Sequence, residues 1–443
     1  MKNILLNMVE KRKAGIHCGI PSFCCANKIV IEAILDQAKR FDDNVVIEAT
    51  SNQVNQNLGY MGMTPMDFRD YVYKIADKID FDRKKIVLGG DHMGPLPWVD
   101  LPSDEAMRNA EILVRMCVRA GYTKIHLDTS MKLGSDDKDK ILEDSVIAER
   151  GAFLYKACED EFEKLLENNP EAVHPVYVIG SEVPIPGGSQ KKEDSVEITT
   201  PEKFSQTLLA YHKKFKEYNL SKAWENIIAM VVQPGVEFGN NEIVIYDRIK
   251  AYSLCQELRH YPDIVFEGHS TDFQPPLKLR EMVEDGIAII KVGPALTFAL
   301  REALFALEKM EIELVPEYKK RSHFSEILEK EMLENPKHWL KYYKGSEFKI
   351  ALDRKYSYSD RSRYYFALKS VNNAINRLLG NMKKVNIPLG MLHQYMPLQY
   401  IKVRDGKIKF EPKELVKDSI VSLVEDYNYA VKYNYMTSSV FVR

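Results

Sequence analysis

The chain has 443 residues, enough for one α/β barrel of about 250 residues and a further segment. Its 62 lysine and arginine residues nearly balance its 64 aspartate and glutamate residues, which gives a formal net charge of −2. Such a chain lacks the strong positive field that holds a nucleic acid or an anionic membrane surface. Its apolar runs are also shorter than the ~18 to 20 residues of a membrane span, so we expect a cytoplasmic protein that binds neither.

Eight short apolar stretches recur along the chain, each ending in polar or Gly/Pro-rich residues and each followed by a segment with helical periodicity. They span Gly15 to Asn27, Val45 to Asn52, Lys85 to Pro95, Lys124 to Ser130, Val176 to Gly188, Ile227 to Gly239, Ile264 to Asp272 and Ile287 to Gly293. This alternation predicts a (β/α)8 TIM barrel over residues 1–310. In such a barrel the carboxyl ends of all strands surround one mouth, where distant polar residues converge.

The pattern changes after residue 310. Residues 311–443 contain charged helical stretches and a Tyr- and Arg-rich segment, YSYSDRSRYYF, at positions 356–366. We predict a mainly helical C-terminal appendage that packs on the barrel. Because Tyr and Arg are favoured at interface cores, the YSYSDRSRYYF segment is either a contact for a partner protein or a lid over the barrel.

The six cysteines lack the paired spacing of a zinc or redox module. They are Cys18, Cys24, Cys25, Cys117, Cys158 and Cys255. We expect reduced and mostly structural thiols. Cys24 and Cys25 close the first apolar stretch and are the two that could face the mouth.

Two histidines at predicted strand ends form a candidate divalent metal site. His92 follows Gly-Gly-Asp on the third strand, and His269 ends the seventh. Glu182 after the fifth strand and Gln233 after the sixth are further candidate ligands, although Glu182 could instead cap its loop and Gln233 could bind substrate. Nitrogen and oxygen ligands of this kind suit Zn²⁺, with Mn²⁺, Co²⁺ and Ni²⁺ as alternatives.

Acidic residues beside these ligands are candidates for proton transfer. Asp91 precedes His92, Asp128 ends the fourth strand, and Glu182 ends the fifth. His126 lies two residues before Asp128 and therefore on the same face of the strand. It also lies deeper, so we expect it to be a hydrogen-bonded core histidine.

Other polar residues at the strand ends could bind a polyol. The candidates for substrate binding are Ser51, Asn52, Gln233, Ser270, Asp272 and Lys291. Lys291 stands within an otherwise apolar eighth strand. It is either one half of a buried ion pair, or a lysine that binds a substrate oxygen or forms a Schiff base.

Long motifs identify a resemblance. The stretches VVIEATSNQVNQNLGYMGMTPMDFRD, LGGDHMGP, GHSTDF, KVGPALTFALREALFALE, YSDRSRYY and IPLGM closely resemble the Z subunit family of class II D-tagatose-1,6-bisphosphate aldolase, over nearly the entire chain. Members of that family are described as non-catalytic partners of the aldolase Y subunit in galactitol or N-acetylgalactosamine catabolism. Some have carried a tagatose-6-phosphate kinase label. Certain relatives are described as metal-dependent 4-epimerases that interconvert tagatose and fructose or their 6-phosphates.

A more remote resemblance is to the catalytic class II aldolases. Asp91 and His92 match their Asp-His pair after strand three, and His269 resembles their strand-seven zinc ligand. The pattern departs at Gln233, where those enzymes have histidine, and at HSTDF, which replaces their glycine-rich phosphate loop. The second change puts bisphosphate binding in doubt. A kinase is disfavoured because the chain contains no G-x-x-x-x-G-K-[ST] loop.

Two functions follow from the resemblance. The first is an enzyme that epimerises C4 of a ketose or ketose phosphate, by retro-aldol cleavage and re-addition at the metal-competent mouth. The second is a scaffold that stabilises and activates an aldolase Y subunit. The resemblance leaves both open, together with a homo-oligomeric state.

Overall fold

Eight parallel strands close into a barrel in this protein, whose computed structural model describes residues 2–181 and 196–432. The strands in chain order are β1 (Ile20–Cys24), β2 (Val45–Thr50), β3 (Ile86–Met93), β4 (Lys124–Leu127), β5 (Val176–Ile179), β6 (Ile227–Val232), β9 (Val265–Gly268) and β10 (Ile287–Val292). Each neighbouring pair is parallel, and β10 returns to β1. The predicted (β/α)8 barrel is thereby confirmed, and every strand lies within its predicted stretch.

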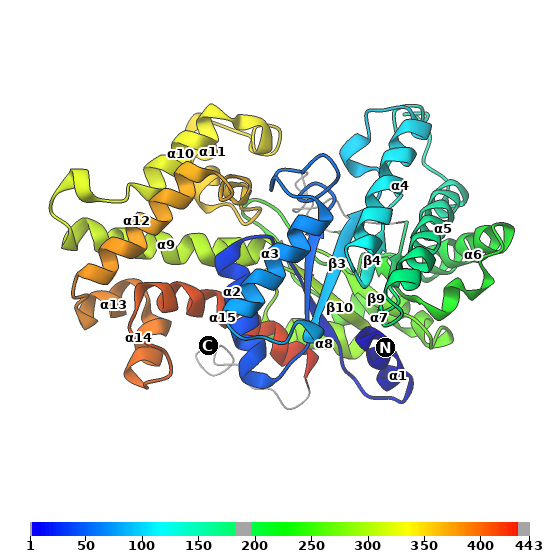
Figure 1. The fold of residues 1–443 in the computed structure, drawn as a ribbon, viewed down its shortest axis with the longest axis horizontal. Coiled ribbons are helices and arrows are strands. Elements are labelled where there is room, and N and C mark those ends of the chain that lie inside the picture. The colour runs from blue at the N-terminus through cyan, green and yellow to red at the C-terminus, as the bar shows by residue number, and fades with distance from the viewer. Residues whose placement is uncertain (1, 182–195, 433–443) are drawn as a thin grey trace.

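Helices surround the barrel, and each strand of the barrel is followed by one (Figure 1). They are α2 (Lys28–Phe41), α3 (Pro65–Lys78), α4 (Ser103–Arg119), α5 (Asp144–Asn168), α6 (Pro201–Glu217), α7 (Arg248–Glu257), α8 (Pro276–Asp285) and α9 (Pro294–Leu314). Thr64 starts α3 through a capping box with Asp67, and Thr200 caps α6. A short hairpin, β7 (Glu237–Phe238) with β8 (Ile243–Val244), stands between β6 and α7.

The amino-terminal helix α1 (Ile4–Lys13) closes the end of the barrel opposite the mouth. Leu5, Met8 and Val9 join the apolar cluster that fills the barrel interior. Asn3 caps this helix, and its side-chain amide donates to the carbonyls of Thr123 and His174. With this end covered by α1, the cavity of the barrel lies at the carboxyl ends of the strands.

The C-terminal helices lie beside the barrel (Figure 1). They are α10 (Phe324–Glu334), α11 (Glu347–Tyr356), α12 (Lys369–Lys384), α13 (Leu389–Tyr395), α14 (Pro397–Arg404) and α15 (Pro412–Val431). Helix α9 runs unbroken across residue 310, so the barrel and the appendage share one helix. Helix α15 returns to pack against α2, α8 and α9.

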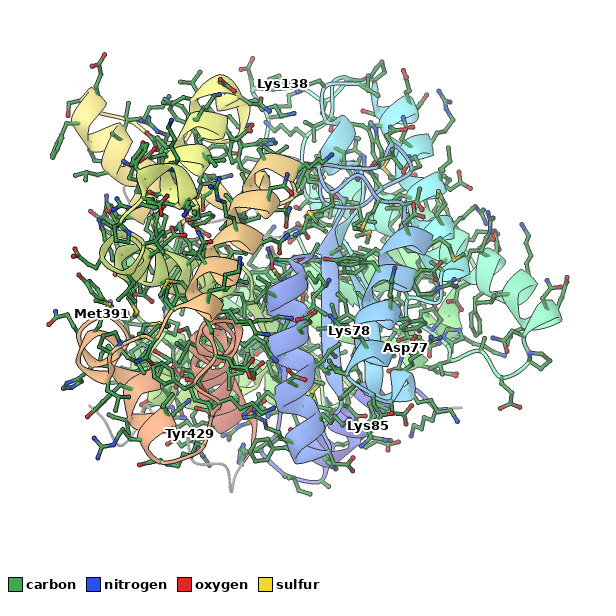
Figure 2. The ribbon with its side chains drawn as sticks, turned by 60° about the vertical axis from the view of Figure 1, so that its left-hand side comes forward. Asp77, Lys78, Lys85, Lys138, Met391 and Tyr429 are labelled. Atoms are coloured by element: carbon green, nitrogen blue, oxygen red, sulfur yellow. The ribbon has the colours of Figure 1, made fainter. Side chains whose placement is uncertain are left out.

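The outer faces of the helices carry many charged side chains. Figure 2 labels Asp77 and Lys78, which are exposed on α3, and Lys138, which is exposed in the loop between β4 and α5. Among the residues that the structure describes, no helix is long and apolar enough to cross a bilayer.

Candidate functional site

A cavity of about 840 Å³ opens at the mouth of the barrel. Its walls include the carboxyl ends of β1, β2, β3 and β10 and residues of the loop after β9. The C-terminal segment around Arg363 and Tyr364 also lines it. The mouth of the barrel and part of the appendage therefore enclose one space.

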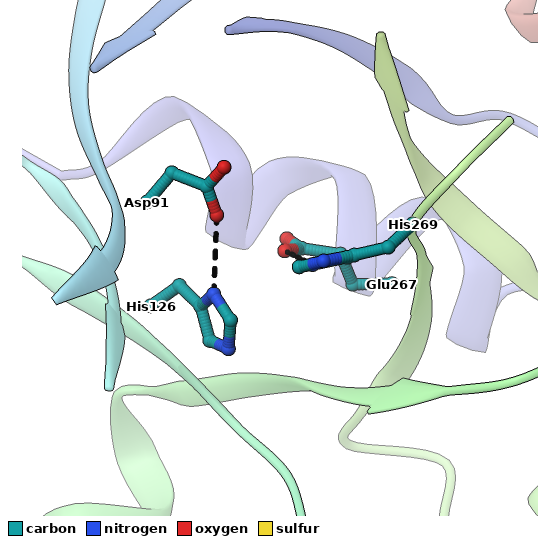
Figure 3. Close-up of side chains that lie close together, drawn as sticks. All are labelled: Asp91, His126, Glu267 and His269. Carbon is teal, nitrogen blue, oxygen red and sulfur yellow. Dashed lines mark hydrogen bonds and ion pairs between the residues drawn. The ribbon is translucent and has the colours of Figure 1, made fainter. Parts of the chain in front are cut away.

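Four buried side chains form a cluster that we call the floor, and two of them, Asp91 and His269, line the cavity (Figure 3). Asp91 comes from β3, His126 from β4, Glu267 from β9, and His269 directly follows β9. Each offers one ligand atom, and these atoms lie within 4.8 Å of one another. His126 Nδ1 lies 3.2 Å from Asp91 Oδ1, and His269 Nε2 lies 2.9 Å from Glu267 Oε1. Two imidazoles and two carboxylates at this spacing form a candidate metal site.

His92 stands beside this group. Its ring centroid is 5.0 Å from that of His126 and 5.0 Å from that of His269, so the two strand-end histidines share the mouth as we expected. Its Nδ1 lies 2.7 Å from Asp128 Oδ2, and its Nε2 lies 3.8 Å from Asp91 Oδ1. A carboxylate that accepts a hydrogen bond from one ring nitrogen orients the imidazole so that the other nitrogen can bind a metal. This is the usual arrangement around metal-bound histidines.

Two buried lysines support the floor from below. Lys124 Nζ lies 2.7 Å from Glu48 Oε1 and 2.7 Å from Glu267 Oε2, and all three side chains are fully buried. Lys291 Nζ contacts Glu48 and lies 2.6 Å from Asp91 Oδ1. The ion-pair alternative for Lys291 is thus what the structure shows, although Lys291 also lines the cavity.

The charges of the floor favour a bound cation. Among the described residues, four buried carboxylates, those of Glu48, Asp91, Asp128 and Glu267, face two ammonium groups and the His92 imidazole, so negative charge remains in excess even when His92 is protonated. Buried negative charge in excess is costly unless it is compensated. His126 Nε2 is also buried and has no hydrogen-bond partner among the described residues. A divalent metal fits both observations.

The pKa shifts agree with ionised carboxylates and a neutral imidazole. Burial opposes the ionisation of Asp91 and Glu267, but the charges of His92 and Lys291 at Asp91, and of Lys124 at Glu267, hold both pKa values well below their usual range. Burial lowers the pKa of His269 to about 4, so that its ring is neutral and able to bind a metal.

The pKa of His92 moves the other way. Burial lowers it, but the charge of Asp91 and the hydrogen bond to Asp128 outweigh burial and raise it. Despite burial, the same hydrogen bond lowers the pKa of Asp128 to about 2. Asp128 Oδ1 also accepts from the backbone N–H and the hydroxyl of Ser130. Asp128 is therefore engaged on both oxygens.

Several predicted site residues line the cavity. They are Asn52, Asp91, His92, His269, Ser270, Asp272 and Lys291. His92 and Ser270 have left-handed backbone conformations, with φ of 49° and 53°, which are uncommon for residues other than glycine. Cys24 and Cys25 also line the cavity, but burial raises the pKa of Cys25 to about 12 and that of Cys24 well above its usual value, so neither is a ready nucleophile.

Other predicted residues lie outside the cavity wall. The Gln233 side-chain oxygen accepts from the backbone N–H groups of Gly235 and Val236, and this fixes a turn. Ser51 is fully buried, and among the described residues its hydroxyl has no hydrogen-bond partner. Glu182 lies outside the described residues.

His126 and Glu267 are the residues that sequence reasoning missed. We expected His126 to be a hydrogen-bonded core residue, and it is buried and bonded through Nδ1 to Asp91 and to the backbone N–H of His92; what we did not expect is that it also belongs to the metal-competent group. Glu267 lies two residues before His269, on the same face of the chain, just as His126 lies two before Asp128. The sequence did contain a signal for both residues. Each is a charged or imidazole side chain inside an apolar strand, two residues before a candidate site residue at the strand end.

Comparisons with known proteins agree with the resemblance. Residues 5–432 match the model of the family described as D-tagatose-1,6-bisphosphate aldolase subunit GatZ/KbaZ-like. A solved structure from Sinorhizobium meliloti 1021, described as a probable tagatose 6 phosphate kinase, is 43% identical and covers 93% of this chain and 100% of its own, with a TM-score of 0.84. The YdjI aldolase from Escherichia coli K12 is 13% identical over 84% of this chain and 97% of its own, with a TM-score of only 0.42. The match over nearly the whole length shows that the chain belongs to the GatZ/KbaZ-like family of D-tagatose-1,6-bisphosphate aldolase subunits.

Proposed function

We propose that the protein is a metal-dependent 4-epimerase that interconverts tagatose and fructose, or their 6-phosphates. The observation that carries this proposal is the convergence of Asp91, His126, Glu267 and His269, with His92 beside them, on the floor of a cavity of about 840 Å³. A cavity of this size lies in the range of small-molecule sites. A deep polar floor under a sugar-sized space supports chemistry on the substrate as well as binding.

The chemistry required is the cleavage of a carbon–carbon bond. C4 of a 2-ketose is one carbon beyond the position acidified by the C2 carbonyl, so simple proton exchange cannot invert it. Cleavage between C3 and C4, rotation of the aldehyde and re-addition to its other face would invert it. A divalent metal, when bound by His92, His126, His269 and Glu267, would supply the Lewis acid that polarises the C2 carbonyl.

The protein's own side chains would move the proton and hold the sugar. Asp91 lines the cavity as an ionised carboxylate, the form that accepts the C4 hydroxyl proton, and Lys291 orients it from 2.6 Å. Asp128 would keep His92 in place and is a positioning residue in this scheme. Asn52 and Ser270 line the wall where sugar hydroxyls need partners.

The test is turnover by the purified protein alone. The metal-free protein is loaded separately with Zn²⁺, Mn²⁺, Co²⁺ or Ni²⁺ and incubated with tagatose 6-phosphate or tagatose, and the fructose counterpart is measured. We expect turnover with at least one metal, and its loss on chelation and in His92→Ala and His269→Ala. His212→Ala is the matched control, because His212 stacks on Trp224 and is not among the residues that line the cavity. Full activity in the two site variants would reject the site.

A solvent-isotope experiment tests the bond that breaks. Retro-aldol cleavage leaves the hydrogen on C4 in place throughout, whereas deprotonation at C4 exchanges it with solvent. We therefore expect the product formed in D₂O to carry no deuterium at C4, as measured by NMR. Deuterium at that carbon would overturn the cleavage mechanism even if the epimerase activity itself is confirmed.

A second function is a scaffold for a catalytic aldolase subunit. The family description names an aldolase subunit, and the appendage exposes an apolar stripe of Phe348, Leu352 and Tyr356, four residues apart on α11. Such a stripe suits a protein partner. Absence of turnover with every metal, together with activation of a co-expressed Y subunit, would favour this function.

A further inference from the structure

The Tyr- and Arg-rich segment, residues 356–366, reaches the barrel mouth. Arg363, Tyr364 and Phe366 line the same cavity as His92 and His269. We propose that this segment is part of the substrate site and that Arg363 binds the terminal phosphate of a ketose 6-phosphate. The sugar identity rests on the proposed function above, whereas the phosphate contact rests on the contacts described here.

Among the described residues no carboxylate forms an ion pair with Arg363, although the charges of Asp360 and Asp272 act on it without direct contact. The hydrogen-bond partners of its guanidinium are neutral oxygens. Nη1 donates to the carbonyls of Ser359 and Asp360, and Nη2 donates to the Tyr364 hydroxyl at 3.1 Å. A guanidinium fixed in this way on a cavity wall is prepared to bind a phosphate, since its planar fork matches the phosphate oxygens.

A second guanidinium strengthens the positive field at this wall. Arg361 Nη1 donates to the same Tyr364 oxygen at 3.3 Å, and the Arg361 guanidinium stacks on Tyr342, which also lines the cavity. Burial opposes ionisation of the Tyr364 phenol, but the two arginines outweigh burial and lower its pKa. Tyr60 packs against Tyr364 with ring centroids 4.6 Å apart. An anion entering this part of the cavity meets positive charge on an aromatic wall.

The segment is anchored to the barrel by Asp360. Its carboxylate accepts from Arg301 Nε at 2.8 Å and from Thr297 Oγ1 at 2.6 Å, and both of these residues lie on α9. Asp360 itself has a left-handed φ of 40°, so the turn before Arg363 is held in a sparsely populated conformation. Because α9 directly follows β10, this anchor fixes Arg363 relative to the mouth.

The other common phosphate position of a TIM barrel is filled by a carboxylate. In many such barrels a phosphate binds near the last strands, at a helix N-terminus. Here Asp272 Oδ1 accepts from the backbone N–H groups of Gly293 at 3.0 Å and Ala295 at 2.8 Å, at the start of α9. A second phosphate at this position would be repelled by the carboxylate, because the backbone N–H groups that could bind it already donate to Asp272. The site therefore suits a monophosphate and disfavours a bisphosphate.

Calorimetric binding to the metal-loaded protein tests the assignment. We expect fructose 6-phosphate to bind at least tenfold more tightly than fructose, and fructose 1,6-bisphosphate to bind no more tightly than the 6-phosphate. Arg363→Met should reduce the preference for the 6-phosphate at least tenfold, and Arg363→Lys should retain part of it. Arg377→Met is the matched control, because Arg377 also donates to backbone carbonyls but lies outside the cavity wall.

Each outcome bears on a separate statement. An unchanged preference in a folded Arg363→Met protein would overturn the phosphate assignment, and tighter binding of the bisphosphate would overturn the single-phosphate inference. Tighter binding of fructuronate than of fructose 6-phosphate would show that the wall selects a carboxylate instead. The affinity ratio can be measured whether or not the protein turns over its ligand, so a protein that selects the 6-phosphate through Arg363 but does not epimerise it refutes only the proposed activity. Circular dichroism and thermal melting confirm that each variant is folded.

Discussion

Replacement of Lys124 by methionine tests whether the buried charges of the barrel floor act as a unit. Lys124 Nζ contacts Glu48 and Glu267, each at 2.7 Å, and none of the three side chains is exposed to solvent. Lys124→Met keeps much of the apolar length of the side chain and removes the charge. It leaves four carboxylates of the floor with Lys291 as their one remaining ammonium group among the described contacts.

The expected loss of stability is large. Breaking a buried ion pair by removing one partner costs about 3 to 5 kcal/mol, because the remaining charge is left without compensation. This is a substantial fraction of the roughly 5 to 15 kcal/mol by which domains are stable. Lys124 is the strongest of the charges that hold down the pKa of Glu267, so we also expect that pKa to rise and the affinity for the metal to fall.

Denaturant unfolding of the metal-free and metal-loaded proteins measures both effects. The exposed Lys140→Met is the control, since the 3.4 Å contact of Lys140 with Asp137 joins two exposed side chains and should contribute little. Glu48→Gln is combined with Lys124→Met to close a double-mutant cycle, in which we expect a coupling of about 1 to 3 kcal/mol. A loss below about 1 kcal/mol in Lys124→Met, or additive single effects, would refute the reasoning.

Three further predictions concern single residues. His126→Asn should weaken metal binding about 10- to 100-fold, as measured by competition with a chromophoric chelator, and unchanged affinity would exclude His126 as a ligand. Burial raises the pKa of Asp272 from 3.8 to about 6, so the protonated form stabilises the fold below about pH 4 and this contribution is lost as the pH rises through about 6. Asp272→Asn should therefore gain up to about 3 kcal/mol relative to the native protein between pH 4 and pH 7, and a pH-independent difference would contradict this. Asp360→Asn should destabilise the protein by about 3 kcal/mol because Arg301 loses its buried partner at 2.8 Å, and a melting temperature equal to that of the native protein would show that the anchor is dispensable.

The barrel could be predicted from the sequence because each of its eight strands is a short apolar run that ends in polar or Gly/Pro-rich residues. Local periodicity is enough for that prediction, and the closed strand order then follows from parallel pairing of successive strands. The proximity of His92 and His269 could be predicted for the same reason, since both end strands of one barrel. The β7–β8 hairpin could not, because its two-residue strands carry no periodic signal.

The floor of the site was harder to predict. A charged residue inside an apolar strand can be either a core residue or a metal ligand. Which of the two it is depends on the neighbouring strands and on their register along the barrel. His126 lies against Asp91 because β3 and β4 are neighbours whose register shifts between Gly90 and Met93, just where Asp91 stands. The position of Arg363 at the mouth was predicted only as one of two alternatives, a lid over the barrel or a contact for a partner protein, because composition alone does not say where a segment of the appendage packs.

The return of α15 has a consequence for the synthesis of this protein. The helix buries Leu415, Ile420 and Val424, and the Tyr427 hydroxyl contacts Thr271, two residues after His269. Ribosomes therefore release all eight strands long before the helix that covers α2 and α8 has been made. Until then the nascent barrel exposes the apolar surface that α15 later covers and is open to aggregation.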